Sequence, residues 1–341
     1  MERTMATIDL QEPDRVAASP WQGGWATRLI DRKWIEHSND PQVHAESQLA
    51  AYEICKLDGV NVNIGIPVVP GAIGCPVDEP EDDFPKVQGH IVHSVDDVNK
   101  LKLPDPEKDG FMPTMLGAIR ILKRQLKDEV PVWSATSAPW QVAGNLRGLQ
   151  EWFVDSIMNP ELIDKTLEFC GKAVSIWAEA MIDAGADILF IGDSLATGDL
   201  ISVDDYKKWA RPYEREIIQL AHNKGAKVIL HICGRTSDRW EEMLETGADL
   251  FDLDAPIDMA AAKQQLGDRI CIKGNIDTTL MVRGTPEDIE QISKKLVEGC
   301  APGGGFILGS GCELGRDTPV ENVQMMAEVV RKYGWYDGNE S

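Results

Sequence analysis

The segment Lys227-Val-Ile-Leu-His-Ile-Cys-Gly234 predicts both a fold and a chemistry. Side chains alternate across a β-strand, so this segment divides into two faces. One face is wholly aliphatic and suits packing against helices: Val228, Leu230 and Ile232. The other face carries Ile229, His231 and Cys233, which we expect to point inward at the end of the strand.

Similar apolar, β-branched segments recur along the chain, and longer helical patterns lie between them. The predicted strands are Arg15–Ser19, Gly59–Ile64, Val130–Thr136, Ile188–Gly192, Lys227–Ile232, Leu250–Asp254, Ile270–Gly274 and Phe306–Gly309. Repeated strand and helix units indicate a parallel sheet, so we predict an α/β fold, a (β/α)₈ TIM barrel with an N-terminal extension. The first strand is the weakest, and without it a doubly wound sheet with seven strands would remain.

Helices are expected wherever the apolar pattern changes to a helical period. They are Gln42–Leu57, Pro113–Lys127, Leu149–Ala184 with a break at Asn159-Pro160, Tyr206–Asn223, Ser237–Glu245, Met259–Leu266, Pro286–Glu298 and Pro319–Tyr333. Two long segments, Pro67–Pro85 and Pro104–Pro113, are expected to be irregular. Loops at the C-terminal ends of barrel strands build active sites, so a lid or docking surface and a plain solvated loop are equally open interpretations.

The overall composition bounds the kind of protein. A chain of 341 residues with 43% hydrophobic content can bury one large core, so we expect a single domain over residues 1–341. The net charge of −22 argues against nucleic acid and anionic membranes as partners, because both need a basic face. The first residues lack the apolar core of a signal peptide, and no apolar stretch is long enough to span a bilayer. We therefore expect a cytoplasmic protein.

Two of the seven cysteines stand apart from the others. Five have no second metal ligand nearby and are expected to be buried thiols: Cys55, Cys75, Cys170, Cys271 and Cys300. Cys233 follows His231 by two residues, and Cys312 lies in a glycine-rich loop after the last predicted strand. These three side chains are therefore predicted to meet at one end of the barrel.

An imidazole and two thiolates can bind one tetrahedral zinc ion and leave a fourth position open for catalysis. The pair of His231 and Cys233 alone is more often part of a core, and the third ligand Cys312 favours zinc. Asp254 could act as an exchangeable fourth ligand or as an acceptor beside the ligands. Asp193 and Asn275 also end predicted strands, where substrate contact and helix or turn capping explain them equally well.

The chain resembles the uroporphyrinogen decarboxylase superfamily from about Asp14 to Tyr333. The resemblance is carried by Ser137-Ala-Pro-Trp140, Gly192-Asp-Ser194, the stretch Ile201–Tyr213 and Lys273-Gly-Asn-Ile-Asp277. This superfamily has a (β/α)₈ barrel, in agreement with the strand pattern.

Other residues indicate the cobalamin-dependent methyltransferase branch. The Gly-His-Gly of decarboxylases is replaced by Gly309-Ser310-Gly311, their tyrosine by Asn145, and their arginine-rich N-terminal loop by Trp21-Gln-Gly-Gly-Trp25. In contrast, His231-Ile-Cys233 and Gly311-Cys312-Glu313 match the zinc motif of methylcobamide:coenzyme M methyltransferases at each ligand. Asp254 lies where that branch has an acidic residue near the zinc.

The resemblance implies a zinc enzyme that moves a methyl group between a corrinoid (cobalamin) protein and a thiol such as coenzyme M. Methylcobalamin would be a co-substrate held by a separate protein, because the chain lacks a D-x-H-x-x-G cobalt-ligand motif. A donor-side enzyme that passes methyl from an ether or amine to a corrinoid protein remains open. A metal-free lyase like uroporphyrinogen decarboxylase and a catalytically silent corrinoid-binding protein also remain.

Overall fold

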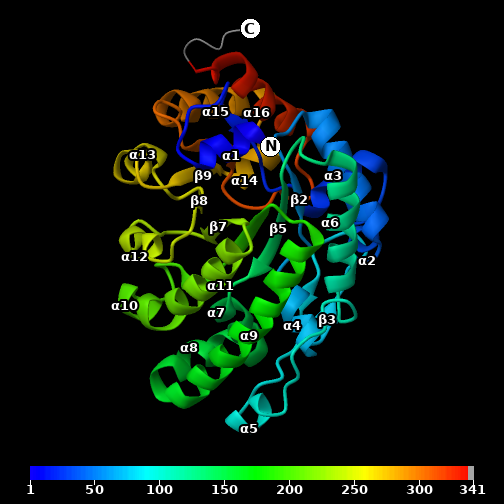
Figure 1. The fold of residues 1–341 in the computed structure, drawn as a ribbon, viewed down its shortest axis with the longest axis vertical. Helices are drawn as coiled ribbons and strands as arrows, with labels where there is room; N and C mark the ends of the chain where they lie inside the picture. Colours follow the sequence, from blue (N-terminus) through cyan, green and yellow to red (C-terminus); the bar gives the residue numbers. More distant parts are fainter. Residues whose placement is uncertain (337–341) are drawn as a thin grey trace.

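The computed structural model describes residues 1–336, and its centre is a barrel of eight parallel strands surrounded by helices (Figure 1). The strands are β1 (Ala17–Ala18), β2 (Val60–Val62), β5 (Val132–Ser137), β6 (Ile188–Gly192), β7 (Lys227–Ile232), β8 (Leu250–Leu253), β9 (Cys271–Ile276) and β10 (Phe306–Ser310). Their order is β1-β10-β9-β8-β7-β6-β5-β2. Each expected strand is present, including the weak first one, so the prediction of a TIM-barrel-like α/β fold is confirmed.

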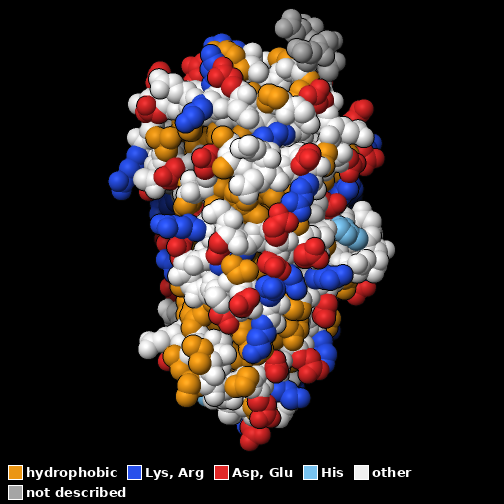
Figure 2. All heavy atoms as spheres, turned by 90° about the vertical axis from the view of Figure 1, so that its left-hand side faces the viewer, with side chains coloured by type: hydrophobic (Ala, Val, Ile, Leu, Met, Phe, Trp, Pro, Cys, Tyr) orange, Lys and Arg blue, Asp and Glu red, His pale blue; other side chains and the backbone are white. Residues whose placement is uncertain are grey.

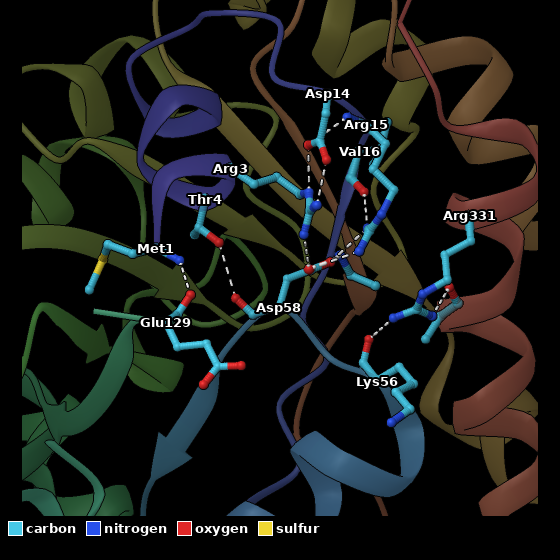
Figure 3. Close-up of polar contacts among 12 residues, drawn as sticks. Met1, Arg3, Thr4, Asp14, Arg15, Val16, Lys56, Asp58, Glu129 and Arg331 are labelled. Carbon is cyan, nitrogen blue, oxygen red and sulfur yellow. Dashed lines mark hydrogen bonds and ion pairs between the residues drawn. The ribbon is translucent and has the colours of Figure 1, made fainter. Parts of the chain in front are cut away.

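Strands β1 and β2 end the order, and the described residues form no ladder between them. Hydrogen bonds across this seam replace the ladder. The amide of Asp58 donates to the Ala18 carbonyl at 2.9 Å, and the Asp58 carboxylate accepts from the Ala18 amide at 2.8 Å. The same carboxylate accepts from the Arg15 guanidinium at 2.8 and 3.0 Å and from Arg3 at 2.6 Å (Figure 3). The seam is therefore held by Asp58 and by Asn61 of β2, whose Oδ1 accepts from the Gln22 amide at 2.9 Å.

Strand phase divides the core as the sequence predicted. Val228, Leu230 and Ile232 belong to the large apolar layer between strands and helices, whereas Ile229 belongs to a smaller cluster inside the barrel. This inner cluster also contains Ala17, Trp133, Ala135, Ile188, Phe190, Leu250, Cys271 and Ile307. Ile8 of the N-terminal helix α1 (Glu2–Ile8) joins them. The predicted N-terminal extension thus adds a side chain to the barrel interior.

The outer layer consists of helices that follow the strands (Figure 1). The longer ones are α3 (Pro41–Cys55), α6 (Met112–Leu126), α7 (Pro139–Arg147), α8 (Leu149–Met158), α9 (Pro160–Ala184), α11 (Arg211–Asn223), α13 (Met259–Leu266), α15 (Pro286–Cys300) and α16 (Val320–Tyr333). Short ones are α2 (Trp34–Asn39), α4 (Val68–Ile73), α5 (Val95–Val98), α10 (Val203–Asp205), α12 (Trp240–Leu244) and α14 (Thr278–Arg283). Two 3₁₀ segments, η1 (Gly23–Ile30) and η2 (Ser194–Ala196), and a π-helical turn, η3 (Tyr206–Ala210), complete the set.

Three local expectations need correction. Segment Pro67–Pro85 is not wholly irregular: it contains α4, and β3 (Val77–Asp78) pairs with β4 (Lys86–Val87) as a small antiparallel hairpin. The apolar start of α4 is buried, which stabilises a helix that its proline and glycine disfavour. Helix α7 was not expected and occupies the space after β5. The expected helix Tyr206–Asn223 begins with the π-helical turn η3.

The surface carries both signs of charge. On the face drawn in Figure 2, Lys and Arg side chains are scattered among Asp and Glu side chains. None of the helices described combines the length and the apolar character that crossing a membrane requires.

Candidate active site

His231, Cys233 and Cys312 meet at the C-terminal end of the barrel. Their ligand atoms all lie within 4.8 Å of one another, and His231 Nε2 is 3.1 Å from Cys233 Sγ. Two ligand atoms bound to one tetrahedral zinc ion lie roughly 3.5–3.8 Å apart. The observed distances, from 3.1 Å to at most 4.8 Å, span this range. Among the described residues, no other set of three His, Cys, Asp or Glu side chains converges in this way. The three residues chosen from the sequence are therefore brought together.

Backbone geometry at two glycines allows this convergence. Gly234 directly follows Cys233 and has φ +74°, a left-handed conformation that glycine adopts without strain. Its amide donates to Asp254 Oδ2 at 2.6 Å. Gly311 directly precedes Cys312, and a Cβ atom there would lie 2.6 Å from the amide nitrogen of Ala255. Glycine at this position thus lets the loop that carries Cys312 approach the loop after β8.

His231 is oriented by the neighbouring strand. Its Nδ1 atom lies 2.9 Å from the carbonyl oxygen of Asp252 and 3.5 Å from Asp252 Oδ2. Metal-binding histidines usually donate their second ring N–H to such an oxygen, which fixes the tautomer and directs the other nitrogen to the metal. The carbonyl of Asp252 therefore leaves His231 Nε2 available to a metal ion.

A buried ion pair supports this arrangement. Asp252 on β8 and Lys273 on β9 are register partners, and Lys273 Nζ lies 2.6 Å from Asp252 Oδ1. Both side chains are 1% exposed. A charge buried this deeply is tolerated only with its counter-charge, so the pair fixes Asp252 beside His231.

The pKa values of the three candidate ligands are shifted in different directions. The hydrogen bond with Cys312 lowers the pKa of Cys233, and the Ser194 hydroxyl, 3.2 Å from Cys233 Sγ, acts in the same direction. The contact with Cys233, together with burial, raises the pKa of Cys312. Burial lowers the pKa of His231, but the hydrogen bond with Cys312 and the charge of Asp252 outweigh burial and raise this pKa to about 9. A metal cation at this point would displace the shared protons.

A cavity of about 150 Å³ opens beside the ligand set. Trp21 and Phe190 form one wall, with stacked rings whose centroids are 4.3 Å apart. Asn63 and Glu313 form another, where Asn63 Nδ2 donates to Glu313 Oε2 at 2.8 Å. Burial, followed by the nearby Cys312, raises the pKa of Glu313. The cavity is thus largely apolar, with a few polar groups, as is usual for a small-molecule site.

The other predicted site residues do not line this cavity. The carboxylate of Asp254 accepts from the amides of Gly234 and Ala255, at 2.6 and 2.7 Å. Asn275 Nδ2 donates to the carbonyls of Asp254 and Ile257, at 3.0 and 2.8 Å. Both side chains therefore shape the loops around the ligands, and any contact of theirs with substrate stays a prediction.

Asp193 is fully buried and faces Glu214 rather than the cavity. The two acids are next to each other, and the amides of Leu195 and Ala196, at the start of η2, lie close to the Asp193 carboxyl group. Burial, followed by the charge of Glu214, raises the pKa of Asp193. Burial also raises the pKa of Glu214 to about 7, although Tyr206 donates to Glu214 Oε2 at 2.6 Å. Asp193 and Glu214 thus form a buried acid pair in which both pKa values are raised, and Asp193 directly precedes Ser194.

Several polar residues of the site were not among the candidates, among them Asn63 and Glu313 of the cavity wall. Ser194, Asp252 and Lys273 all continue the inward-facing phase of their strands, which is the signal that could have identified them. By contrast, Asp193 lies an odd number of residues after the inward-facing Phe190, so alternation turns its side chain to the other face.

Solvent exposure also distinguishes the two candidate ligand cysteines from the other five cysteines. Cys233 and Cys312 are partly exposed, whereas the remaining five are buried. Burial raises the pKa of each of these five thiols, and within the described residues none of them belongs to a group of three potential metal ligands. The donor set of one imidazole and two accessible thiols suits Zn²⁺, which prefers nitrogen and sulfur ligands.

Comparison with known proteins shows which family the chain belongs to. The chain is 29% identical over 340 residues to the methylcobamide:CoM methyltransferase MtbA of Methanosarcina acetivorans, which covers 97% of both chains. It is 27% identical over 317 residues to a uroporphyrinogen decarboxylase of Pseudoalteromonas atlantica, covering 90% of this chain and 88% of the relative.

A solved methyltransferase from Methanosarcina mazei shares the fold, with a TM-score of 0.88 at 24% identity over 97% of this chain and 98% of that chain. The family described as uroporphyrinogen decarboxylase (URO-D) matches residues 1–333. The chain therefore belongs to the uroporphyrinogen decarboxylase family.

Proposed function

We propose that this protein is a zinc-dependent methyltransferase that moves a methyl group from a methylated corrinoid protein to a thiol, the class to which coenzyme M belongs. The convergence of His231, Cys233 and Cys312 beside an apolar cavity carries this proposal. Relatives named methylcobamide:CoM methyltransferase match 97% of the chain, which supports the same reaction. The cytoplasm stays the predicted compartment.

The three ligands would hold the metal and leave its fourth position facing the cavity. Zinc in this set would lower the pKa of a substrate thiol toward neutrality while keeping its sulfur nucleophilic. The sulfur then attacks the methyl carbon, a carbon–sulfur bond forms and the carbon–cobalt bond breaks. The electron pair of the broken bond stays on cobalt as Co(I), and the thiol proton goes to solvent.

The residues of the chain itself would bind the metal ion and hold its ligands in the right orientation. The carbonyl of Asp252 holds the ring of His231, and Lys273 balances the Asp252 charge. The Ser194 hydroxyl contacts Cys233 Sγ and stabilises its thiolate. The stacked pair of Trp21 and Phe190 excludes water from one side of the reacting sulfur.

The corrinoid protein has to reach the mouth of this cavity. Ile66 lines the cavity and is 43% exposed, and it directly precedes the segment Pro67–Pro85 that contains α4. We infer that this segment contributes to docking of the corrinoid protein. Unchanged affinity for the corrinoid protein after shortening the hairpin would contradict this inference.

Metal analysis tests the ligand assignment. Wild-type protein should contain one zinc ion per chain, and His231→Ala, Cys233→Ser and Cys312→Ser should each lose it. Cys75→Ala is the matched control, because Cys75 is a buried thiol outside the site and its replacement should leave the zinc content unchanged. Equal zinc in all variants would show the assignment to be wrong.

Activity is then measured as demethylation of methylcobalamin by a panel of thiols. Ligand variants should lose more than about 100-fold in rate, since changes beside zinc ligands alone cost about 10–100-fold. Zinc binding without transfer to any thiol, combined with methylation of Co(I) by an ether or amine, would assign the donor-side reaction instead. Full activity in zinc-free protein would contradict the proposal.

A further inference from the structure

One polar side chain in the cavity wall has no hydrogen-bond partner. Gln141 lies in the first turn of α7, lines the cavity and is 4% exposed. Within residues 1–336, its side-chain amide forms no hydrogen bond. Its Oε1 atom is buried, whereas Nε2 retains accessible surface on the side of the cavity. A buried amide without a partner is unfavourable, so Gln141 offers an N–H donor to a bound molecule.

The start of α7 offers further donors beside Gln141. Helix α7 begins at Pro139, and its N-cap residue Ala138 has no polar side chain that could cap it. The backbone amides of Trp140 and Gln141 donate to no acceptor in the described part of the chain. The hydroxyl of Ser137, which ends β5 and lines the cavity, is likewise without a hydrogen bond there. Unpaired amides at a helix start attract anions, because the helix dipole adds to their positive potential.

The carboxyl groups of the cavity wall are bound by other residues. Lys273 Nζ lies 2.6 Å from Asp252 Oδ1 and balances its charge. Asn63 Nδ2 donates to Glu313 Oε2 at 2.8 Å. Neither carboxyl group engages the donors at the start of α7, so these donors are left for a ligand.

The rest of the cavity suits a short carbon chain. The stacked rings of Trp21 and Phe190 are apolar, as are the side chains of Ile66 and Ala135. The volume of about 150 Å³ is the size that accommodates a benzene-sized molecule. The zinc ligands and Gln141 line this same cavity. A thiol held at the metal position therefore needs a tail of only a few carbons to reach Gln141.

We propose that Gln141 and the start of α7 bind an oxyanion, a sulfonate or a carboxylate, at the end of the methyl acceptor. Nε2 of Gln141 donates to one oxygen of this group, and the free amides and the Ser137 hydroxyl donate to the others. The inference rests on the proposed function and deepens it, because it names the residues that select the acceptor. A two-carbon thiol that ends in a sulfonate, as coenzyme M does, meets this description. Gln141 binds the tail and takes no part in the transfer itself.

Direct binding tests this assignment without the transfer reaction. Isothermal titration calorimetry of zinc-loaded protein, without methylcobalamin, gives the Kd of 2-mercaptoethanesulfonate, 3-mercaptopropionate and 1-propanethiol, each corrected for the fraction present as thiolate. Both anionic thiols should bind at least about ten-fold more tightly than 1-propanethiol, since hydrogen bonds to charged groups are the stronger ones. Gln141→Ala should remove most of this difference and change the Kd of 1-propanethiol by less than about two-fold. Unchanged affinity for the sulfonate in Gln141→Ala would overturn the inference.

Two further variants separate a binding role of Gln141 from a structural one. Gln141→Glu keeps the shape of the side chain but adds a negative charge, so it should weaken sulfonate binding and favour cysteamine, whose tail is an ammonium group. Gln141→Met keeps the length and should lose sulfonate affinity without a fall in Tm, because the amide that it removes forms no hydrogen bond. A lower Tm with unchanged affinity would assign Gln141 a structural role and overturn the inference.

Gln150→Ala is the matched control for these variants. Gln150 is exposed on α8 and does not line the cavity, so its replacement should leave every Kd unchanged. Zinc-loaded protein that binds no thiol at all would refute the proposed function. Protein that binds and methylates thiols equally well whatever their tail would refute only the role given to Gln141, so the two failures are distinguishable.

Discussion

Replacing Asp58 with asparagine should destabilise the barrel strongly, because this carboxylate closes the seam between β1 and β2 (Figure 3). The side chains of Asp58 and Arg15 are both 7% exposed. Asp58→Asn leaves the guanidinium of Arg15 buried without its carboxylate, and breaking a buried ion pair in this way costs about 3–5 kcal/mol. Unfolding entropy of about 2.1 cal/mol/K per residue amounts to about 0.7 kcal/mol/K for this chain. The expected fall in Tm is therefore about 4–7 °C.

Asp14→Asn is the matched control. Asp14 also pairs with Arg3, through two hydrogen bonds of 2.7 and 2.5 Å, but its side chain is 42% exposed. Exposed ion pairs contribute at most about 1 kcal/mol, so this variant should lose no more than about 1–2 °C. Differential scanning calorimetry at fixed zinc and protein concentration measures both. Equal falls in Tm for Asp58→Asn and Asp14→Asn would refute the role given to the seam.

Three further changes probe the surroundings of the site. Ser194→Ala removes the hydroxyl beside Cys233 Sγ and should weaken zinc binding by about ten-fold in competition with a chromophoric chelator; unchanged affinity would leave the hydroxyl without a role. Lys273→Met leaves the 1% exposed carboxylate of Asp252 unpaired and should lower Tm by about 4–7 °C, unless Asp252→Asn is made with it. Burial raises the pKa of Glu214 from 4.5 to about 7, so its proton stabilises the native state fully below pH 4.5 and this contribution is lost as pH rises through about 7. The Tm of Glu214→Gln relative to wild type should accordingly rise by about 4 °C between pH 5 and pH 8, and a constant difference would contradict the raised pKa.

The barrel could be predicted because its strands are largely apolar on both faces and several of its helices begin at a side-chain cap. Thr285, for example, accepts from the amide of Asp288, and the predicted helix after it is α15. Helix α7 was missed because its segment contains glycine and asparagine and has little apolar period. Helix α4 was missed because tertiary burial, rather than local preference, stabilises it.

The ligand set could be predicted because alternation along a strand is a geometric rule. It gave the inward direction of His231 on β7 and still holds for Cys233, one residue after that strand, but it does not hold for Asp254 after β8. Strand β8 ends at Leu253, so the side chain of Asp254 turns to backbone amides instead of the cavity. The pairing of Asp252 with Lys273 depends on the register between β8 and β9, and the sequence of either strand alone does not give that register.

The seam between β1 and β2 gives the barrel a property that a fully laddered barrel lacks. At this joint the amide and carboxylate of Asp58, together with the hydrogen bond from the Gln22 amide to Asn61 Oδ1, stand in place of a strand ladder. Trp21 follows β1 and Asn63 follows β2, and both line the cavity. The joint therefore places two side chains of the cavity wall, one from each of its sides, at a point of the described sheet where neighbouring strands share no ladder, while β7, which carries His231, lies inside the laddered part.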